Sequence, residues 1–351
     1  MDTKLSENRV LTRQTGLFEA ASRKEIGEVL QVSPELLQKA HRRFPVQWPK
    51  YYLQLSQEEA VAKMGRPTSA ELEPHHGDIA DPISDQFLRP VPFVVRKHQD
   101  RVILLTTKKC HFYCRFCFRR EEPVSLAAEP SADDWTQIYA YLAENPEIRE
   151  PILSGGDPLT LSNVQLFRIQ TAFCKIPSIK KWRIHTRAPV VWPKRITPEL
   201  MEGLSGPLPL TVVAHYNHAS EITPEAQRIA GLMAKYKVVY KNQAVLLAGV
   251  NNRFQDQFNL WQQLHELGIE PHYIHHPDRV PGNAQFRTTI QAGLDIYRQL
   301  KQTANFPLPS YVLDLPDGTG KVPVEQLEHQ GNGLYHYQHP NGVLSSYRDI
   351  E

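Results

Sequence analysis

The stretch Cys110-His-Phe-Tyr-Cys114-Arg-Phe-Cys117-Phe-Arg-Arg120 contains three of the four cysteines of this 351-residue chain. It follows an apolar run, Val102-Ile-Leu-Leu-Thr106, with the composition of a buried strand. Thiolates are soft ligands for iron and zinc, and three of them in one short loop can converge on one metal centre. A four-iron cluster normally takes four cysteines, so three leave one iron open to a non-protein ligand. The stretch therefore predicts a metal centre, with zinc and His111 as the alternative.

The composition is that of a globular protein without a strong charge. Hydrophobic residues make up 41% of the chain, and the formal net charge is +2. This balance argues against nucleic-acid and membrane-surface partners. The chain has no apolar run of about 18 residues, and its N-terminus lacks the apolar region of a signal peptide. Few, clustered cysteines favour a reducing compartment, so a cytoplasmic protein is expected.

The chain divides into four parts by pattern. Ser33-Pro34-Glu35 has the residues of a helix start, and Asn341-Gly342 between alternating residues predicts a terminal β-hairpin. Prolines exclude a long regular element from the second part. The expected parts are a helical N-terminal extension at 1–65, a proline-rich connector at 66–99, a barrel at 100–305, and a lysine loop with the hairpin at 306–351.

Strand-like and helical segments alternate from residue 100 onward. Ser131, which precedes the acids Asp133 and Asp134, marks one helix start, and Thr223-Pro224-Glu225 marks another, with Thr223 as the expected cap. Cys174 lies on a helical segment and is expected to be a buried thiol. Alternation of this kind predicts an α/β fold with a parallel sheet, and six units suit a partial (β/α)6 barrel. The expected strands are 102–106, 151–154, 182–186, 209–214, 238–247 and 269–275, with a further short one at 310–314.

Polar residues follow these strands where each one ends. In a parallel barrel, the carboxyl ends of the strands share one face, where sites form. The pattern therefore predicts one shared site. Its members are Cys110 after the first strand, Gly155-Gly156-Asp157-Pro158 after the second, His185 and Arg187 at the third, His215 after the fourth, and His275, His276 and Asp278 at the sixth.

Two glycine-containing stretches carry further chemistry. In Ser154-Gly-Gly-Asp-Pro158 the glycines allow a ligand close to the backbone, and Asp157 can accept a hydrogen bond from an ammonium group. The same residues also make an ordinary turn. Asp314-Leu-Pro-Asp-Gly-Thr-Gly-Lys321 is not a nucleotide-binding P-loop. Its lysine can form a Schiff base with pyridoxal phosphate (PLP), or it is an exposed turn lysine.

The cysteine spacing resembles that of the radical S-adenosylmethionine (SAM) superfamily. The motifs, taken in chain order over roughly residues 80–349, resemble one branch of it, the lysine 2,3-aminomutases. The matching segments are Asp100-Arg-Val102, Cys114-Arg-Phe-Cys117-Phe-Arg-Arg120, Leu153-Ser-Gly-Gly-Asp-Pro-Leu159, Arg195-Ile-Thr197, Asn217-His-Ala-Ser-Glu-Ile-Thr223, Asn242-Gln-Ala-Val-Leu-Leu247, Phe286-Arg-Thr288 and the stretch that ends at Lys321.

The resemblance implies a role for each matching residue. Two positions depart from the family pattern, because Lys97 stands where arginine is usual and His275 where an aromatic hydroxyl is usual. A bidentate guanidinium suits a carboxylate, and two carboxylates suit one ammonium. The implied set is Cys110, Cys114 and Cys117 for a 4Fe-4S cluster; Gly155, Gly156, Asp157 and Gln243 for cofactor binding, the first three at SAM; Lys321 for PLP, with Arg101 and Lys97 at its phosphate; Arg119 for the substrate carboxylate; and Asp278 and Asp314 for the distal ammonium of the substrate.

The implied enzyme is an isomerase that moves the α-amino group of L-lysine to the β-carbon, with SAM as a reusable source of a radical. The alternatives are a lysine aminomutase acting in β-lysylation of elongation factor P, and an aminomutase for another basic amino acid. A non-catalytic iron–sulfur or zinc protein is the alternative from a different class. The expected partners are a small amino acid and an electron donor such as flavodoxin or ferredoxin, and a homo-oligomer is left open.

Overall fold

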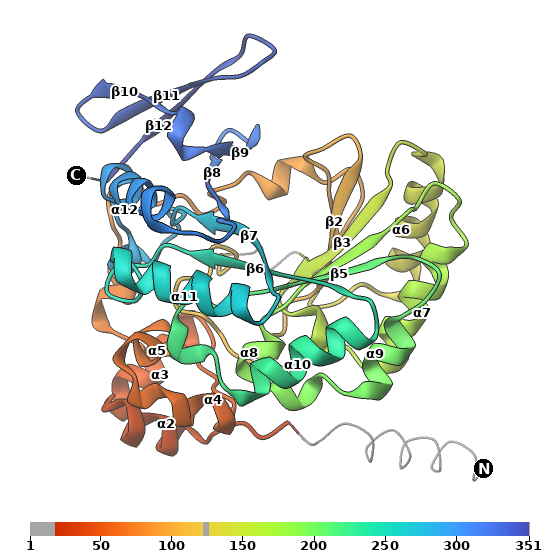
Figure 1. The fold of residues 1–351 in the computed structure, drawn as a ribbon, viewed down its shortest axis with the longest axis horizontal. Helices are drawn as coiled ribbons and strands as arrows, with labels where there is room; N and C mark the ends of the chain where they lie inside the picture. The colour runs from red at the N-terminus through yellow and green to blue at the C-terminus, as the bar shows by residue number, and fades with distance from the viewer. Residues whose placement is uncertain (1–17, 122–125, 351) are drawn as a thin grey trace.

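A curled sheet of nine strands forms the centre of the computed structural model, which describes residues 18–121 and 126–350 (Figure 1). The strands lie side by side in chain order. Strands β2 to β8 run parallel, whereas β1 and β9 pair antiparallel at the two edges. The strands are β1 Val94–Val95, β2 Arg101–Thr107, β3 Glu150–Gly155, β4 Trp182–His185, β5 Leu210–Ala214, β6 Val239–Val245, β7 Glu270–His275, β8 Ser310–Leu315 and β9 Gly320–Pro323.

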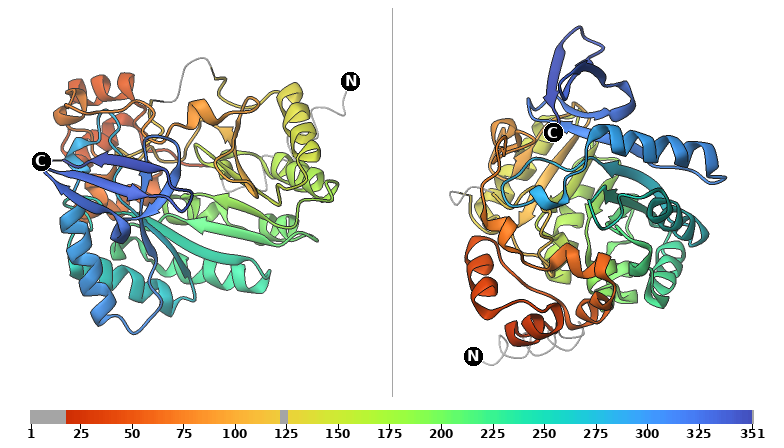
Figure 2. Two further views of the ribbon diagram at one scale, coloured as in Figure 1. Left: turned by 90° about the horizontal axis from the view of Figure 1, so that it is seen from above. Right: turned by 90° about the vertical axis from the view of Figure 1, so that its left-hand side faces the viewer.

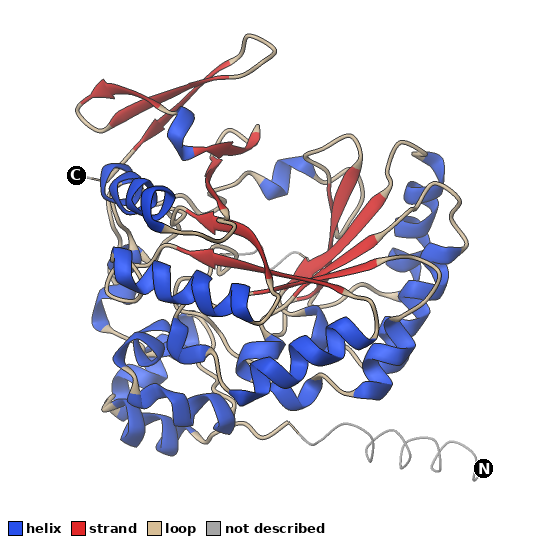
Figure 3. Cartoon of the chain, in the orientation of Figure 1, coloured by secondary structure: helices blue, strands red, loops and turns tan. Residues whose placement is uncertain are grey.

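Helices cover the outside of the curled sheet and join each parallel strand to the next (Figures 1 and 3). The α/β fold with a partial barrel, predicted from the alternation of strands and helices, is confirmed. Among the helices of the described residues, none is long and apolar enough to cross a membrane. The crossover helices are α6 Ala132–Glu144, α7 Asn163–Cys174, α8 Ala188–Val191, α9 Pro198–Leu204, α10 Pro224–Lys235, α11 Phe254–Glu266 and α12 Ile290–Thr303.

The last part of the sheet differs from the expectation in two ways. The short strand expected at 310–314 is β8, which joins the barrel as a seventh parallel strand beside β7. Strand β9 then turns back along β8, with Lys321 directly opposite Asp314. Lys321 therefore lies in a strand and not at the end of a loop. Pairing between two strands fixes this lysine more firmly than a glycine-rich loop would.

The N-terminal helices form a group that packs against the barrel (Figures 1 and 2). The helix start predicted at Ser33 is confirmed, because its hydroxyl accepts a hydrogen bond from the Leu36 N–H, 3.3 Å away. Residues 1–17 of the expected extension lie outside the described residues. The helices of this group are α2 Arg23–Leu30, α3 Pro34–Arg43, α4 Lys50–Gln54 and α5 Glu59–Gly65.

Two local expectations are wrong. Thr223 precedes α10, but its side chain does not cap the helix. Its hydroxyl lies 2.8 Å from the Tyr51 hydroxyl and so bonds to the N-terminal helices instead. Cys174 is exposed at the end of α7, whereas a buried thiol was expected. A tertiary contact determines the environment of Thr223, and the position at the end of a helix determines that of Cys174. The local sequence pattern determines neither.

The C-terminus forms a small separate sheet that projects from the barrel (Figure 2). The predicted terminal hairpin is confirmed by strands β11 Leu334–Gln338 and β12 Leu344–Arg348, which pair antiparallel. A third strand, β10 Glu328–Gly331, pairs with β11. The buried Tyr335 and Tyr347 stand opposite each other in this sheet.

Candidate functional site

The cysteine loop and the glycine pair are joined to each other at the carboxyl ends of β2 and β3. The Gly156 N–H donates to the Thr107 carbonyl at 2.6 Å, and the Asp157 N–H donates to the Lys109 carbonyl at 2.8 Å. A Cβ at Gly156 would lie 2.3 Å from the Lys109 carbonyl oxygen, and Gly155 has a φ of +109°. Both glycines are thus required for two backbones to meet at the start of the cysteine loop.

Replacing Gly156 by alanine should destabilise the protein and disturb the cysteine loop. The new methyl group would meet backbone, which cannot move aside as a flexible side chain can, and overpacking of this kind costs about 1 to 3 kcal/mol or more. Thermal unfolding and the iron bound after anaerobic reconstitution would measure the two effects. Gly231→Ala in α10 is the matched control, because a Cβ there meets nothing within 4 Å. Equal iron content and melting temperature in both variants would contradict this account.

Burial controls the protonation of the three thiols. It is the main cause that raises the pKa of Cys117 to about 11 and the pKa of Cys110 well above its usual value. Burial also raises the pKa of Cys114, although Arg187 opposes it. Thiols in these surroundings become thiolates when a metal supplies positive charge. Within the described ranges, no three His, Cys, Asp or Glu side chains are grouped closely enough to hold one metal ion. A four-iron cluster does not need such a group, because each thiolate binds its own iron.

A buried donor beside the thiols fits a cluster at this place. Arg187 follows β4, and its Nη1 donates to the Cys114 Sγ at 2.8 Å. The Nε of the same guanidinium is buried and has no hydrogen-bond partner among the described residues. A buried N–H without an acceptor is unfavourable. The Arg187 Nε–H is therefore available to donate to a cluster sulfur or to another bound acceptor. The residues present therefore fit an iron–sulfur cluster.

The carboxylate of Asp157 is already occupied by neighbouring donors. Its Oδ1 accepts from the Thr186 hydroxyl at 2.6 Å and from the Leu159 N–H at 3.0 Å, and its Oδ2 accepts from the Arg187 N–H at 2.9 Å. Burial alone would raise the pKa of Asp157, but His111 and these donors lower it. A carboxylate has about four acceptor positions. The hydrogen bonds therefore tie the end of β3 to the start of the loop after β4, and they leave little of Asp157 for a ligand.

A second group of charged residues lies around β8 and β9. The Lys321 Nζ is 3.0 Å from the Asp314 Oδ2, and the His275 Nδ1 is 3.7 Å from the same oxygen. Burial lowers the pKa of Lys321, but Asp314 and then Asp278 raise it, and the net shift is upward. Asp278 is near enough for its charge to act on Lys321. The Nε2 of His275 is buried without a partner among the described residues, which leaves an imidazole nitrogen for a bound cofactor.

Asp85 connects two of the predicted binding residues, and sequence reasoning missed it. The Arg119 Nη2 lies 2.7 Å from the Asp85 Oδ2, and the Lys97 Nζ lies 3.0 Å from the Asp85 Oδ1. Burial would raise the pKa of Asp85, but these two cations lower it. Arg119 also donates to the Ser154 hydroxyl at 3.2 Å, so it links this group to the glycine pair. An acid within a proline-rich segment gives no signal of such a role.

Arg101 and Gln243 make no hydrogen bond to these two groups in the described contacts. Arg101 is the first residue of β2, at the opposite end of the strand from the cysteine loop, and its guanidinium lies 3.5 Å from the Asp100 carboxylate. Partial burial, and then the charges of Arg101 and Lys321, lower the pKa of His98, so both cations lie near this histidine. Gln243 on β6 places its amide nitrogen 2.9 Å from the His215 Nε2. Burial lowers the pKa of His215 to about 3, so this imidazole is neutral.

Replacing Asp278 by asparagine should remove a pH dependence from the stability of the cofactor-free protein. Burial, and then repulsion by Asp314, raises the pKa of Asp278 from 3.8 to about 8. The unfolded chain loses this proton near the lower value and the folded chain near the higher one. The contribution to stability is therefore complete below about pH 4 and is lost as the pH rises to about 8.

Thermal unfolding between about pH 5 and pH 9 would measure this dependence. The melting temperature of the wild type should fall more over that range than that of Asp278→Asn. Asp295→Asn is the control, because Asp295 is exposed on α12 and pairs only with Arg298 and Gln291 in the described contacts. If the Asp278 variant followed the wild-type curve in parallel, this ionisation would not contribute.

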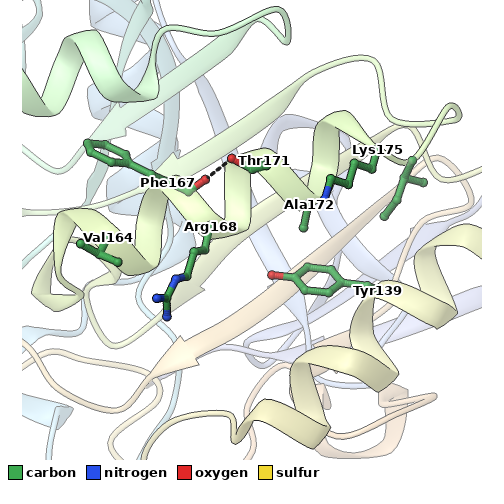
Figure 4. A pocket seen from close by; sticks show the side chains of 8 residues that line it. Tyr139, Val164, Phe167, Arg168, Thr171, Ala172 and Lys175 are labelled. Carbon is green, nitrogen blue, oxygen red and sulfur yellow. Dashed lines mark hydrogen bonds between the residues drawn. The ribbon is translucent and has the colours of Figure 1, made fainter.

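A cavity on the outside of the barrel does not contribute to this site. It lies on α7, with Tyr139 of α6 at one side (Figure 4). Its lining is mostly apolar and includes none of the residues described above. The lining residues are Tyr139, Val164, Phe167, Arg168, Thr171, Ala172, Lys175 and Ile176.

The sequence is similar to several curated aminomutases, although no family model matches it. An L-lysine 2,3-aminomutase from Acetoanaerobium sticklandii is 36% identical over 307 residues, which cover 85% of this chain and 73% of that protein. One from Fusobacterium nucleatum is 34% identical, over 83% of this chain and 69% of that protein. A glutamate 2,3-aminomutase from Clostridioides difficile is 34% identical, over 78% of this chain and 66% of that protein.

Among solved structures, native anSMEcpe with bound AdoMet has a TM-score of 0.43 and 12% identity to this chain. The match covers 57% of this chain and 58% of that one. A likeness of this size is too distant to bear on the chemistry of the site.

Proposed function

This chain belongs to the L-lysine 2,3-aminomutase family of radical SAM enzymes, and from that premise we propose that its substrate is L-lysine, whose α-amino group it moves to the β-carbon. The chain is thus an isomerase, an aminomutase that uses SAM. Family membership alone does not select the amino acid, because a glutamate 2,3-aminomutase is among the relatives.

The observation that supports a basic substrate is the pair of carboxylates Asp278 and Asp314. They lie near each other, and the repulsion between them helps to raise the pKa of Asp278. An ammonium group bound between them would favour the ionised form of both carboxyls, whereas an acidic side chain would add a further negative charge beside Asp314. In the cofactor-free protein the Asp314 carboxylate forms an ion pair with Lys321. With PLP held by Lys321, the same carboxylate would be available to the distal ammonium of the substrate.

The other charged residues provide two places for anions. We assign the carboxylate of the substrate to Arg119, whose planar guanidinium can make two parallel hydrogen bonds. The phosphate of PLP is assigned to Lys97 and Arg101. Asp85 lies between Arg119 and Lys97 and holds both by ion pairs, so it orients the two anion-binding side chains.

Cys110, Cys114 and Cys117 would hold a cluster that supplies the radical together with SAM, and Lys321 would hold PLP until the substrate amine replaces it, so that PLP can stabilise the migrating nitrogen. The protein positions the reacting groups and excludes water. The charges of Asp157 and His275 act on His215, so this imidazole lies near the proposed cofactor sites. Both His215 and Gln243, which bonds to it, are neutral, so they add no charge that would compete for the substrate. A small electron-transfer protein such as flavodoxin or ferredoxin would reduce the cluster.

An anaerobic assay tests the proposal. The protein is reconstituted with iron, sulfide and PLP, and SAM, dithionite and one amino acid are added: L-lysine, L-ornithine, L-arginine or L-glutamate. Derivatised β-amino acids are then measured by mass spectrometry. We expect β-lysine as the main product, and a loss of the preference for lysine in Asp278→Asn.

The other outcomes are each informative. A faster reaction with glutamate than with lysine would overturn the assignment of the two aspartates. SAM cleavage without any free β-amino acid would overturn free lysine as the substrate and point to another amino acid, or to a lysine carried by elongation factor P. An enzyme that binds iron but does not cleave SAM would contradict the radical chemistry itself.

A further inference from the structure

Arg187 is a buried cation in direct contact with a cysteine of the proposed cluster. Its Nη1 donates to the Cys114 Sγ at 2.8 Å, and the residue is 6% exposed. The ring of Phe112, from the cysteine loop, lies against the guanidinium, with the ring centroid 4.9 Å from its central carbon. The donor therefore lies within the protein interior, where water cannot screen its charge.

Two further residues hold the guanidinium in place. The Arg187 Nη2 donates to the Glu221 Oε1 at 2.7 Å and to the Tyr52 hydroxyl at 2.8 Å. The Tyr52 hydroxyl in turn donates to the Glu221 Oε1 at 2.6 Å. Glu221 is itself fixed, because its other oxygen accepts from the Asn217 N–H at 2.6 Å. The network is buried and connects α4 to the loops after β4 and β5.

We propose that Arg187 sets the reduction potential of the iron–sulfur cluster by hydrogen bonding to Cys114, and that Glu221 and Tyr52 act as positioning residues for it. This inference rests on the proposed cluster. Reduction adds one negative charge to the cluster, and a nearby positive charge stabilises the reduced form more than the oxidised one. Hydrogen bonds to cluster sulfur act in the same direction. Glu221 partly offsets the charge of Arg187, so the two residues have opposite effects on the potential.

The test is a redox titration of the reconstituted protein, followed by electron paramagnetic resonance of the reduced cluster. For Arg187→Gln we expect a lower potential, with at least a tenfold fall in the ratio of reduced to oxidised cluster at the wild-type midpoint, or about 59 mV for one electron. Glu221→Gln should shift the potential upward, and Tyr52→Phe should shift it only slightly. If Arg187 and Glu221 had only structural roles, their two variants would not shift the potential in opposite directions.

Arg183→Gln is the matched control, because Arg183 is also on the β4 segment and pairs with a glutamate, Glu150, but has no hydrogen bond to sulfur among the described residues. Its potential should equal that of the wild type. An unchanged potential in Arg187→Gln with full iron content would overturn the inference. If that variant does not assemble a cluster, the upward shift in Glu221→Gln decides, and a downward or absent shift there also overturns it. A wild type without iron would contradict the proposed function instead.

Discussion

Lys321→Ala should lower aminomutase activity by about 10³-fold or more, the scale of removing a catalytic group, while the iron content stays at the wild-type level. Lysine supplies the primary amine that binds PLP covalently, and alanine cannot. Lys321 lies on β9, away from the cysteine loop after β2, so the cluster does not depend on it. The visible absorbance of bound PLP and its trapping by borohydride would measure the covalent link, and β-lysine formation would measure activity.

Two further variants separate the chemistry of Lys321 from its charge. Alanine leaves the buried Asp314 without the cation that lies 3.0 Å away, which by itself would destabilise the protein. Lys321→Arg keeps the ion pair but offers no nucleophilic amine, so it should melt like the wild type and still be inactive. Lys301→Ala is the control, because Lys301 is an exposed lysine on α12 that pairs with Glu325. Covalent PLP in Lys321→Ala would exclude this lysine.

The parts of the fold that follow from local patterns were predictable. Apolar runs separated by helical segments predicted the parallel strands, and β3 and β8 are buried along nearly their whole length, as such runs require. The common direction of those strands then placed the residues at or just after their carboxyl ends at one edge, including Cys110, Gly155 and His275. Short-range spacing of this kind needs no knowledge of tertiary structure.

The contacts that complete the site join distant segments, and the sequence carries no signal for them. Tyr52 reaches Arg187 across 135 positions, and Asp85 reaches Arg119 across 34. Both Tyr52 and Asp85 come from segments with no expected chemistry, the helical extension and the proline-rich connector. At Thr223 the sequence does carry a local signal, for a helix cap, but the hydroxyl bonds to Tyr51 instead. Long-range partners overrode local preference in each case.

Cys114→Ala should abolish both the cluster and the activity. In the proposed cluster each of the three thiolates would bind a different iron, so the loss of one would leave two protein ligands for four irons, too few to retain a stable cluster. Cys114 also accepts the hydrogen bond from Arg187, whose buried charge would then lose that acceptor. We therefore expect this variant to bind less iron after reconstitution and to melt at a lower temperature than the wild type.

Cys174→Ala provides the matched comparison within the same chain. Cys174 is the fourth cysteine, exposed at the end of α7, and in the described contacts it neither meets the cysteine loop nor accepts a hydrogen bond. Its replacement should leave iron content, the visible spectrum and activity unchanged. Equal loss of iron in both variants would mean that iron binds through exposed thiols in general. Full iron in Cys114→Ala would remove this residue from the ligand set and, with it, the path by which Arg187 acts on the cluster.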